Sequence, residues 1–192
     1  MNWKATLSLV LILTVLSGYV YFFERSPDND NEAANSSSKI SPIYNQTYGE
    51  YDVIELQIIR SQQSAHFVRT DEAFTRDWRM VQPASLPPAA LDQVRVNGAV
   101  TRLARLTPSQ VITNAINLAD YGLASPQLTV TLTISDGQKI TLYAGDKTPI
   151  DDNRYMRLAT DDQTVFLVFS FAVDDLVALL DELPLVPTPL PR

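Results

Sequence analysis

The side chains best suited to catalysis or ligand binding lie in one glycine-containing loop, in pairs of adjacent acidic residues and at a single histidine. The loop Gly145-Asp-Lys-Thr148 shares its Lys-Thr ending with phosphate-binding loops. A phosphate loop, however, needs a glycine directly before the lysine and another glycine five residues earlier. Asp146 occupies the place before Lys147, and its carboxylate would repel phosphate. The sequence therefore predicts a β-turn between strands at this loop, not a nucleotide site.

Adjacent acidic residues are the other candidates for acid–base or metal chemistry. They are Asp151-Asp152, Asp161-Asp162, Asp174-Asp175 and Asp181-Glu182. Neighbouring side chains point to opposite faces of a strand and diverge by about 100° on a helix, so such a pair does not easily converge on one atom. Asp174 and Asp175 are expected near the first turn of the last helix, where negative charge stabilises the helix dipole.

His66 stands in a predicted strand with no second ligand or nucleophile nearby in the sequence, so we interpret it as structural. The motifs G-x-S-x-G, H-E-x-x-H and G-x-G-x-x-G do not occur. We therefore predict no catalytic residue, no cofactor-binding residue, no cofactor and no metal ligand, and we do not expect an enzyme.

Composition excludes several classes of protein. The 192 residues include no cysteine, one histidine, 15 basic and 22 acidic side chains, for a net charge of −7. Without cysteine there is no disulfide, thiolate zinc site, cysteine-ligated iron–sulfur cluster or covalently attached c-type haem. The negative charge argues against nucleic acid as a partner. The length suits a membrane anchor with one globular domain.

An uncharged run near the N-terminus, residues 5–23, predicts a membrane anchor in residues 1–25. The run would span about 28 Å as a helix, close to the hydrocarbon thickness of a bilayer. Its representative positions are Ala5, Leu9, Leu13, Leu16 and Phe23. Lys4 favours a cytoplasmic N-terminus, with the C-terminal domain on the extracytoplasmic side. Because the run ends in Tyr-Val-Tyr-Phe-Phe-Glu, a poor cleavage site, we predict an uncleaved single-pass anchor and not a signal peptide.

Two polar or proline-rich segments flank the predicted domain. Residues 26–50 are predicted to be a flexible polar tether, since most of them cannot contribute to a core. Asp28, Asp30 and Glu32 alternate like the start of a calcium loop, but the glycine and glutamate that such a loop requires are missing. The tail 183–192 can dock as polyproline II on a partner or remain a disordered terminus. Its candidate contacts are Leu183, Pro184, Leu185, Val186 and Pro187.

Strand and helix signals follow one another in two rounds through residues 51–182. Val53–Ile59 and Leu128–Ile134 alternate apolar and polar side chains as half-buried strands do. Shorter strands are predicted at 65–70, 78–81, 140–143, 155–158 and 164–168, and helices at 91–106 and 171–183. Strands followed by a helix in each round predict an α+β fold with antiparallel sheet and packed helices. The rounds 53–106 and 127–180 are offset by 74 residues, which suggests two repeated β-β-β-α units.

Three motifs carry a resemblance to a known family. They are Tyr121-Gly-Leu-Ala-Ser-Pro126, the alternating strand ending in Asp136-Gly137, and Gly145-Asp-Lys-Thr-Pro149. Together they resemble the bacterial domain-of-unknown-function family numbered 4340. The resemblance implies one N-terminal transmembrane helix, an exported α+β domain and no established catalytic activity. It also implies an association with ABC-type transport and gliding systems, beside whose components several members occur.

The short form of the chain is similar to versions from filamentous green phototrophs. For these, the resemblance implies a single-span subunit of the quinol-oxidising alternative complex III. We therefore expect a non-catalytic accessory subunit in the cell membrane, with lipid and integral membrane subunits as partners. The alternative is an extracytoplasmic binding module for a cell-envelope ligand, which would expose aromatic side chains among Tyr143, Tyr155, Phe166 and Phe169. The subunit interpretation expects those side chains to be buried or covered by a partner.

Overall fold

The computed structural model describes residues 3, 43–44, 48–49, 51–70 and 76–186. The chain divides into two compact units, 1–39 and 40–192, and the account below concerns the second. The predicted anchor, with Ala5, Leu9, Leu13, Leu16 and Phe23, lies outside the described residues. Within the described part of the chain, no helix has both the length and the apolar character that crossing a bilayer requires.

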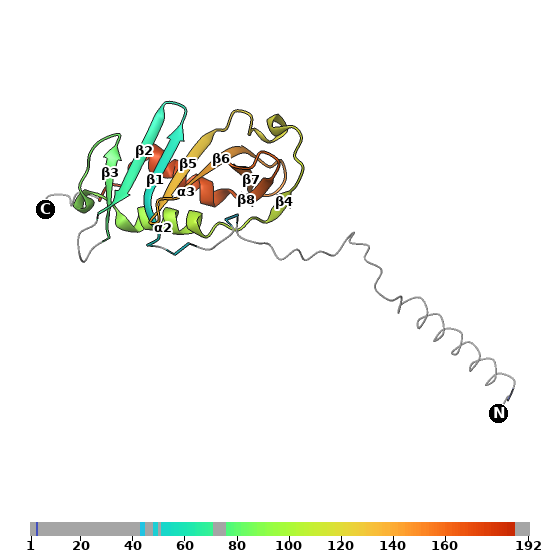
Figure 1. The fold of residues 1–192 in the computed structure, drawn as a ribbon, viewed down its shortest axis with the longest axis horizontal. Coiled ribbons are helices and arrows are strands. Elements are labelled where there is room, and N and C mark those ends of the chain that lie inside the picture. The colour runs from blue at the N-terminus through green and yellow to red at the C-terminus, as the bar shows by residue number, and fades with distance from the viewer. Residues whose placement is uncertain (1–2, 4–42, 45–47, 50, 71–75, 187–192) are drawn as a thin grey trace. The chain divides into compact units, whose positions relative to one another are not determined.

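An eight-stranded antiparallel sheet forms the body of the second unit (Figure 1). The strand order is β3-β2-β1-β5-β6-β7-β8-β4, so β3 and β4 are the two edges. The strands are β1 Val53–Arg60, β2 Gln63–Arg69, β3 Trp78–Gln82, β4 Gln110–Ile112, β5 Leu128–Ile134, β6 Lys139–Lys147, β7 Asn153–Leu158 and β8 Val165–Phe169. With the helices described next, this sheet confirms the predicted α+β class.

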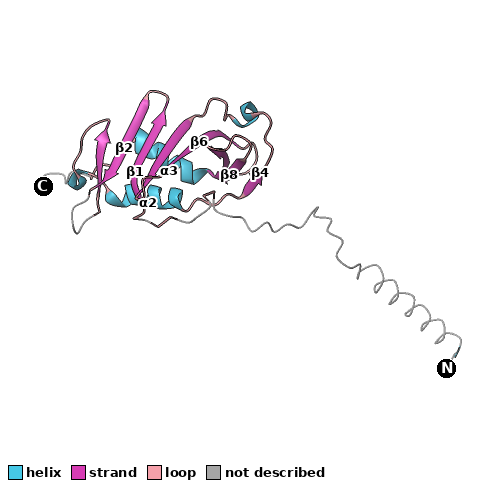
Figure 2. Cartoon of the chain, in the orientation of Figure 1, coloured by secondary structure: helices cyan, strands magenta, loops and turns pink. Residues whose placement is uncertain are grey.

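Two α-helices and two short 3-10 helices accompany the sheet (Figure 2). They are α2 Gln93–Ala104, α3 Ser170–Asp181, η1 Pro88–Ala90 and η2 Leu118–Tyr121. Asp92 caps α2 by accepting hydrogen bonds from the amides of Val94 and Arg95, each at 3.1 Å. The main core lies between the sheet and the two α-helices, where Leu56, Leu132, Val100 and Leu176 are among the buried side chains.

The first three strands follow the same order on each side of the neighbouring pair β1 and β5. Reading outward from this pair, the order is β1-β2-β3 on one side and β5-β6-β7 on the other, where β8 and β4 follow. Leu56 lies opposite Leu132, and Ile58 lies opposite Val130. Val130 and Leu132 stand 74 residues after Leu56 and Ile58, the same offset as the two rounds of the sequence pattern. Equivalent positions therefore exchange partners across the boundary between β1 and β5.

A second, smaller core lies on the other face of the sheet, over β6, β7 and β8. Leu123 and Val165 are buried there, with Tyr121, Tyr143 and Tyr155 packed against them. Tyr143, Tyr155 and Val165 alternate along their strands with residues that face the α-helices. Their side chains must therefore point to the opposite face of the sheet. The segment that contains η2 thus covers one half of the sheet surface.

The folded unit begins before Tyr51, the boundary expected from the sequence. Ile43, Tyr44 and Tyr48, here called the strap, belong to the main core, and both tyrosines are 4% exposed. The Tyr44 hydroxyl donates a hydrogen bond to the carbonyl of Leu103 at 2.8 Å, and the Ile43 amide donates to the carbonyl of Leu106 at 3.3 Å. The predicted tether boundary at residue 50 is corrected, because these apolar side chains fill space beside the C-terminal end of α2.

The buried phenol of Tyr44 makes stability sensitive to alkaline pH. Burial, followed by the charge of neighbouring Tyr48, raises the pKa of Tyr44 above its ordinary value. The unfolded chain would lose this proton near pH 10, while the folded chain retains it, so the free energy of unfolding should fall as pH rises above about 10. In urea titrations, Tyr44→Phe should lose about 1 kcal/mol at neutral pH and decline less steeply with alkali. Parallel pH curves for the two proteins would contradict this.

Gly98 in the middle of α2 should tolerate a side chain. Outside the backbone of the helix, the nearest atom to a Cβ at this position would be the flexible Nη2 of Arg102, at 3.4 Å. Alanine loses less backbone entropy than glycine in a helix, so Gly98→Ala should raise the free energy of unfolding by about 0.5–1 kcal/mol. Urea unfolding monitored by circular dichroism measures this, and a lower midpoint would show that the packing around Gly98 is tighter.

Candidate functional site

Two of the sequence motifs pack directly on one another. Gly122, at the end of η2, has φ +67°, a left-handed conformation that favours glycine, and the Asp146 carboxyl lies against it. A Cβ on Gly145 would strike the carbonyl oxygen of Tyr121. Both glycines are therefore required for the turn at 121–126 to rest on β6, and the spacing of the two motifs follows from this contact.

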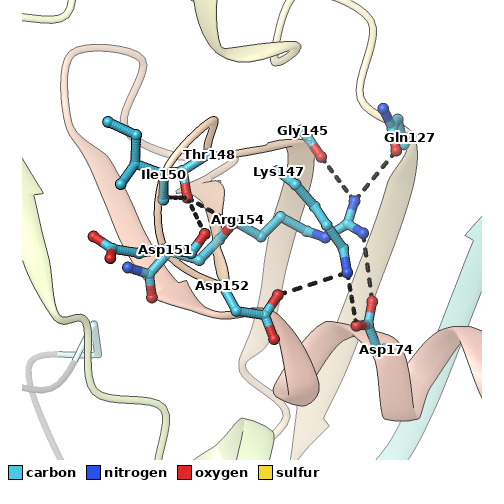
Figure 3. A network of polar contacts seen from close by, with 10 residues as sticks. Gln127, Gly145, Lys147, Thr148, Ile150, Asp151, Asp152, Arg154 and Asp174 are labelled. Atoms are coloured by element: carbon cyan, nitrogen blue, oxygen red, sulfur yellow. Dashed lines mark hydrogen bonds and ion pairs between the residues drawn. The ribbon is translucent and has the colours of Figure 1, made fainter.

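A buried arginine connects this contact to the last helix (Figure 3). Arg154 of β7 is 8% exposed. Its Nη1 donates hydrogen bonds to the Gly145 carbonyl at 3.0 Å and to Gln127 Oε1 at 3.2 Å, and its Nη2 donates to Asp174 Oδ1 at 3.4 Å. The Gln127 amide in turn donates to Asp146 Oδ1 at 2.6 Å. The guanidinium therefore joins β6, the strand-entry residue Gln127 and α3.

The Lys-Thr pair of the glycine-containing loop is also engaged in structural contacts (Figure 3). Lys147 Nζ lies 3.1 Å from Asp174 Oδ2 and 3.7 Å from Asp152 Oδ1. The Thr148 hydroxyl lies 2.8 Å from the Ile150 carbonyl and 2.9 Å from the Asp151 carbonyl, within its own loop. A phosphate would have to compete with two carboxylates for the lysine. The β-turn predicted at 145–148 is corrected, because Gly145, Asp146 and Lys147 are the last residues of β6 and the connection to β7 begins at Thr148.

The positions of Asp174 and Asp175 correct the expectation of a dipole role. Helix α3 begins at Ser170 and has no acidic residue in its first turn, so the pair lies one turn further along. Asp174 instead pairs with Lys147 and Arg154, and Asp175 pairs with Arg102 of α2. These carboxylates therefore connect α3 to the sheet and to the other helix.

Of the remaining candidates, Asp161, Asp181 and His66 have identified partners. Asp161 accepts from the amides of Gln163 and Thr164, and hydrogen bonds from Thr164 and then Gln163 lower its pKa. The hydrogen bond from Arg60 lowers the pKa of Asp181 in the same way. His66 Nε2 lies 3.9 Å from the Glu55 carboxylate. Among the residues with described positions, no three or more of the acidic and histidine side chains gather as a metal site would require.

The four aromatic side chains considered for ligand binding do not form a common surface. Tyr155 packs edge-on against Tyr121 of η2 at 5.0 Å, and the Arg157 guanidinium lies 4.6 Å above the ring of Tyr143. Phe166 is 9% exposed and belongs to the main core. Phe169 alone of the four is largely exposed, at 53%.

The first residues of the tail are held against the start of α2. The Asp92 amide donates to the Pro184 carbonyl at 2.7 Å, and the Val186 amide donates to the Ala90 carbonyl at 3.0 Å. Leu183 packs against the core and Pro184 is buried, while Leu185 and Val186 are 48% and 50% exposed. Pro187 lies outside the described residues. Of the candidate contacts in the tail, Leu185 and Val186 are thus presented outward from a fixed backbone.

An exposed aromatic patch, which the sequence pattern did not reveal, lies at the other end of α2. The rings of Phe169 and Phe171 stack at 5.9 Å and 18°, and they are 53% and 55% exposed. Beside them is a hollow of about 270 Å³. It is lined by Thr101, Arg102, Arg105, Leu106, Thr107, Phe169, Phe171 and Ala172. We call the exposed side chains of Phe169, Phe171 and Arg105, together with the hollow beside them that the buried Leu106 lines, the aromatic patch.

Comparison with known proteins identifies one family. A family model described as Domain of unknown function (DUF4340) matches residues 78–183, which include the turn at 121–126, β6 with its following loop, and α3. Neither the curated proteins nor the solved structures give a significant match. The matched region covers more than half of the chain and contains all three motifs, so the chain belongs to the DUF4340 family.

Proposed function

We propose that this protein is a non-catalytic, membrane-anchored accessory subunit of a larger membrane complex. The observation that carries the proposal is the outward presentation of Leu185 and Val186 by a tail that is hydrogen-bonded to the start of α2. Two adjacent apolar side chains on a fixed, extended backbone suit docking on another protein, because little conformational entropy is lost on binding. The host is a quinol-oxidising electron-transfer complex of the alternative complex III type or an ABC-type transport system.

The contacts of the motif residues support a scaffold role. Lys147, Arg154 and Asp174 bond to one another or to the backbone, and Gly145 serves a close backbone contact. These residues hold β6, β7 and α3 together. A domain whose characteristic residues maintain its shape is suited to presenting surfaces to partners.

The topology supports an internal duplication, that is, the two repeated units that the sequence pattern suggests. The first proposed unit comprises three consecutive antiparallel strands, β1 to β3, followed by α2, whereas the second has four, β5 to β8, before α3. The units meet at β1 and β5, and the shared offset of 74 residues at this pair gives the first three strands of each unit equivalent places about it. Such an arrangement gives one sheet with two helices packed on it, a rigid support for a subunit.

The alternative, a binding module for a cell-envelope ligand, has less support. It would use aromatic side chains on the sheet, but the chain's own η2 segment packs over Tyr143 and Tyr155. Phe166 faces the main core, and Phe169 lies at the junction with α3. The covered aromatic side chains agree better with a subunit.

Purification from native membranes tests the proposed function. The tagged full-length chain would be extracted in mild detergent, and proteins that co-purify at stoichiometric yield would be identified by mass spectrometry. Recovery with integral membrane subunits of a quinol-oxidising or ABC-type system is expected, and it would identify the host. Recovery of the chain alone as a monomer would overturn the subunit proposal and favour an envelope ligand.

A further inference from the structure

We propose that the aromatic patch docks on the surface of the lipid bilayer and holds the C-terminal end of α2 against the membrane. This inference rests on the proposed function in one respect, because it takes residues 5–23 as the membrane anchor. It adds a second contact with the membrane, made by the folded unit itself.

The position of the patch follows from the way the chain enters the folded unit. The Ile43 amide donates a hydrogen bond to the carbonyl of Leu106, and Leu106 lines the hollow beside Phe169 and Phe171. Nineteen residues, 24–42, separate the predicted anchor from this point. Nineteen residues span at most about 65 Å even when fully extended. An anchor at residues 5–23 would therefore keep the patch within reach of the bilayer and raise its effective concentration there.

The chemistry of the patch suits the membrane–water interface. Exposed aromatic rings are preferred at this depth, and an arginine beside them can contact lipid phosphates while its stem lies along apolar surface. Arg105 is exposed, and its side chain has no ion-pair partner among the residues that the structure describes. Arg102, by contrast, pairs with Asp175. On a chain with a net charge of −7, the patch thus presents an unpaired cation.

The size of the patch is sufficient for a contact that is already held near the membrane. Two phenylalanines that are about half exposed offer roughly 200 Å² of aromatic surface. A contact that is already tethered to the membrane needs only weak intrinsic affinity.

Docking of the aromatic patch on the bilayer would keep the tail residues Leu185 and Val186 away from the membrane surface. The patch lies at the C-terminal end of α2, and the tail is bonded to Asp92 at its N-terminal end. A helix of 12 residues is about 18 Å long. Leu185 and Val186 would therefore be held away from the patch, free to meet a protein subunit.

The absence of cysteine allows a direct test with the full-length chain. Thr107→Cys places one label at the patch, and Ile116→Cys places one at a fully exposed control position. Each variant would carry the environment-sensitive fluorophore NBD and be reconstituted into vesicles of phosphatidylcholine and phosphatidylglycerol. We expect a blue-shifted emission that a lipid-borne quencher reduces at position 107, and no shift at position 116.

Substitutions in the patch complete the test. Phe169→Ser with Phe171→Ser, and Arg105→Glu alone, should abolish the shift at position 107 while circular dichroism stays unchanged. Phe171→Ser alone provides a milder change if the double variant fails to fold. Leu185→Ser with Val186→Ser, at the other end of α2, should leave the shift intact.

The outcomes distinguish failure of the docking from failure of the anchor. If the chain fractionates with vesicles but the label at 107 stays in water, docking is overturned and the anchor stands. If the chain does not fractionate with vesicles at all, both are overturned. If the emission at 107 is blue-shifted but a lipid-borne quencher leaves it unchanged, a protein surface covers the patch, and the lipid proposal is wrong.

Discussion

Gly145→Ala is expected to lower the free energy of unfolding by about 3 kcal/mol or more, enough to unfold much of a marginally stable domain. The added methyl group would strike the carbonyl oxygen of Tyr121 and press on the side chain of Leu123. The turn at 121–126 would have to move away from β6, which would also disturb the Arg154 bond to the Gly145 carbonyl. Urea unfolding followed by tryptophan fluorescence measures the loss.

Gly137→Ala is the matched control for this prediction. Gly137, unlike Gly145, has a left-handed backbone that favours glycine, at φ +88°, but a Cβ there would meet no atom within 4 Å. Only the conformational strain remains, for an expected loss of about 1 kcal/mol. Equal losses in the two variants would contradict the claim that close packing of the two motifs, and not turn conformation, determines the effect at Gly145.

Tyr44→Ala is expected to lower the free energy of unfolding by about 3–5 kcal/mol. The ring is almost completely buried beside α2, and the hydroxyl would leave the Leu103 carbonyl without its hydrogen bond. The variant should also expose the main core near Leu106, because Ile43 is bonded to that residue. Urea unfolding and hydrogen exchange of the α2 amides measure these effects.

Tyr51→Ala provides a comparison with a tyrosine only a few residues away. Tyr51 is 54% exposed and contacts the guanidinium groups of Arg69 and Arg76, so its loss should cost about 1 kcal/mol. If the Tyr44→Ala variant were as stable as the wild type, the strap would not contribute to the core. The folded unit would then begin at Tyr51, as the sequence pattern alone indicated.

Most of the sheet could be predicted from the sequence because its strands have one buried face. The alternation of apolar and polar residues in β1 and β5 predicts their bounds to within a residue or two. Strand β4 could not be found, since it has three residues with exposed or half-buried side chains and therefore no alternation. The strap was missed for a different reason. Its apolar residues are few and lie in a polar segment, so only the tertiary fold shows that they are buried.

The candidate surfaces depend on contacts between distant segments, which a single sequence does not reveal. Phe169 and Phe171 flank the junction of β8 and α3, so neither the strand nor the helix period indicates that they lie together and exposed. The hollow beside them also needs Arg105 and Leu106 from the end of α2. The β-turn predicted at 145–148 was wrong in position, because Gly145, Asp146 and Lys147 belong to β6 and carry no apolar alternation that would indicate a strand. The partners of Lys147 could not be predicted either.

The most direct test of the subunit proposal compares two pairs of substitutions in one co-purification experiment. Leu185→Asp with Val186→Asp changes the tail surface, whereas Ile116→Asp with Ile150→Asp changes apolar residues that are 100% and 80% exposed elsewhere. Wild type and the control pair should retain the host subunits at stoichiometric yield from native membranes. The tail pair should remain folded and membrane-bound but lose at least about nine-tenths of the host, as expected when charge is placed in an apolar contact. Full retention of the host by the tail pair would contradict the proposed contact.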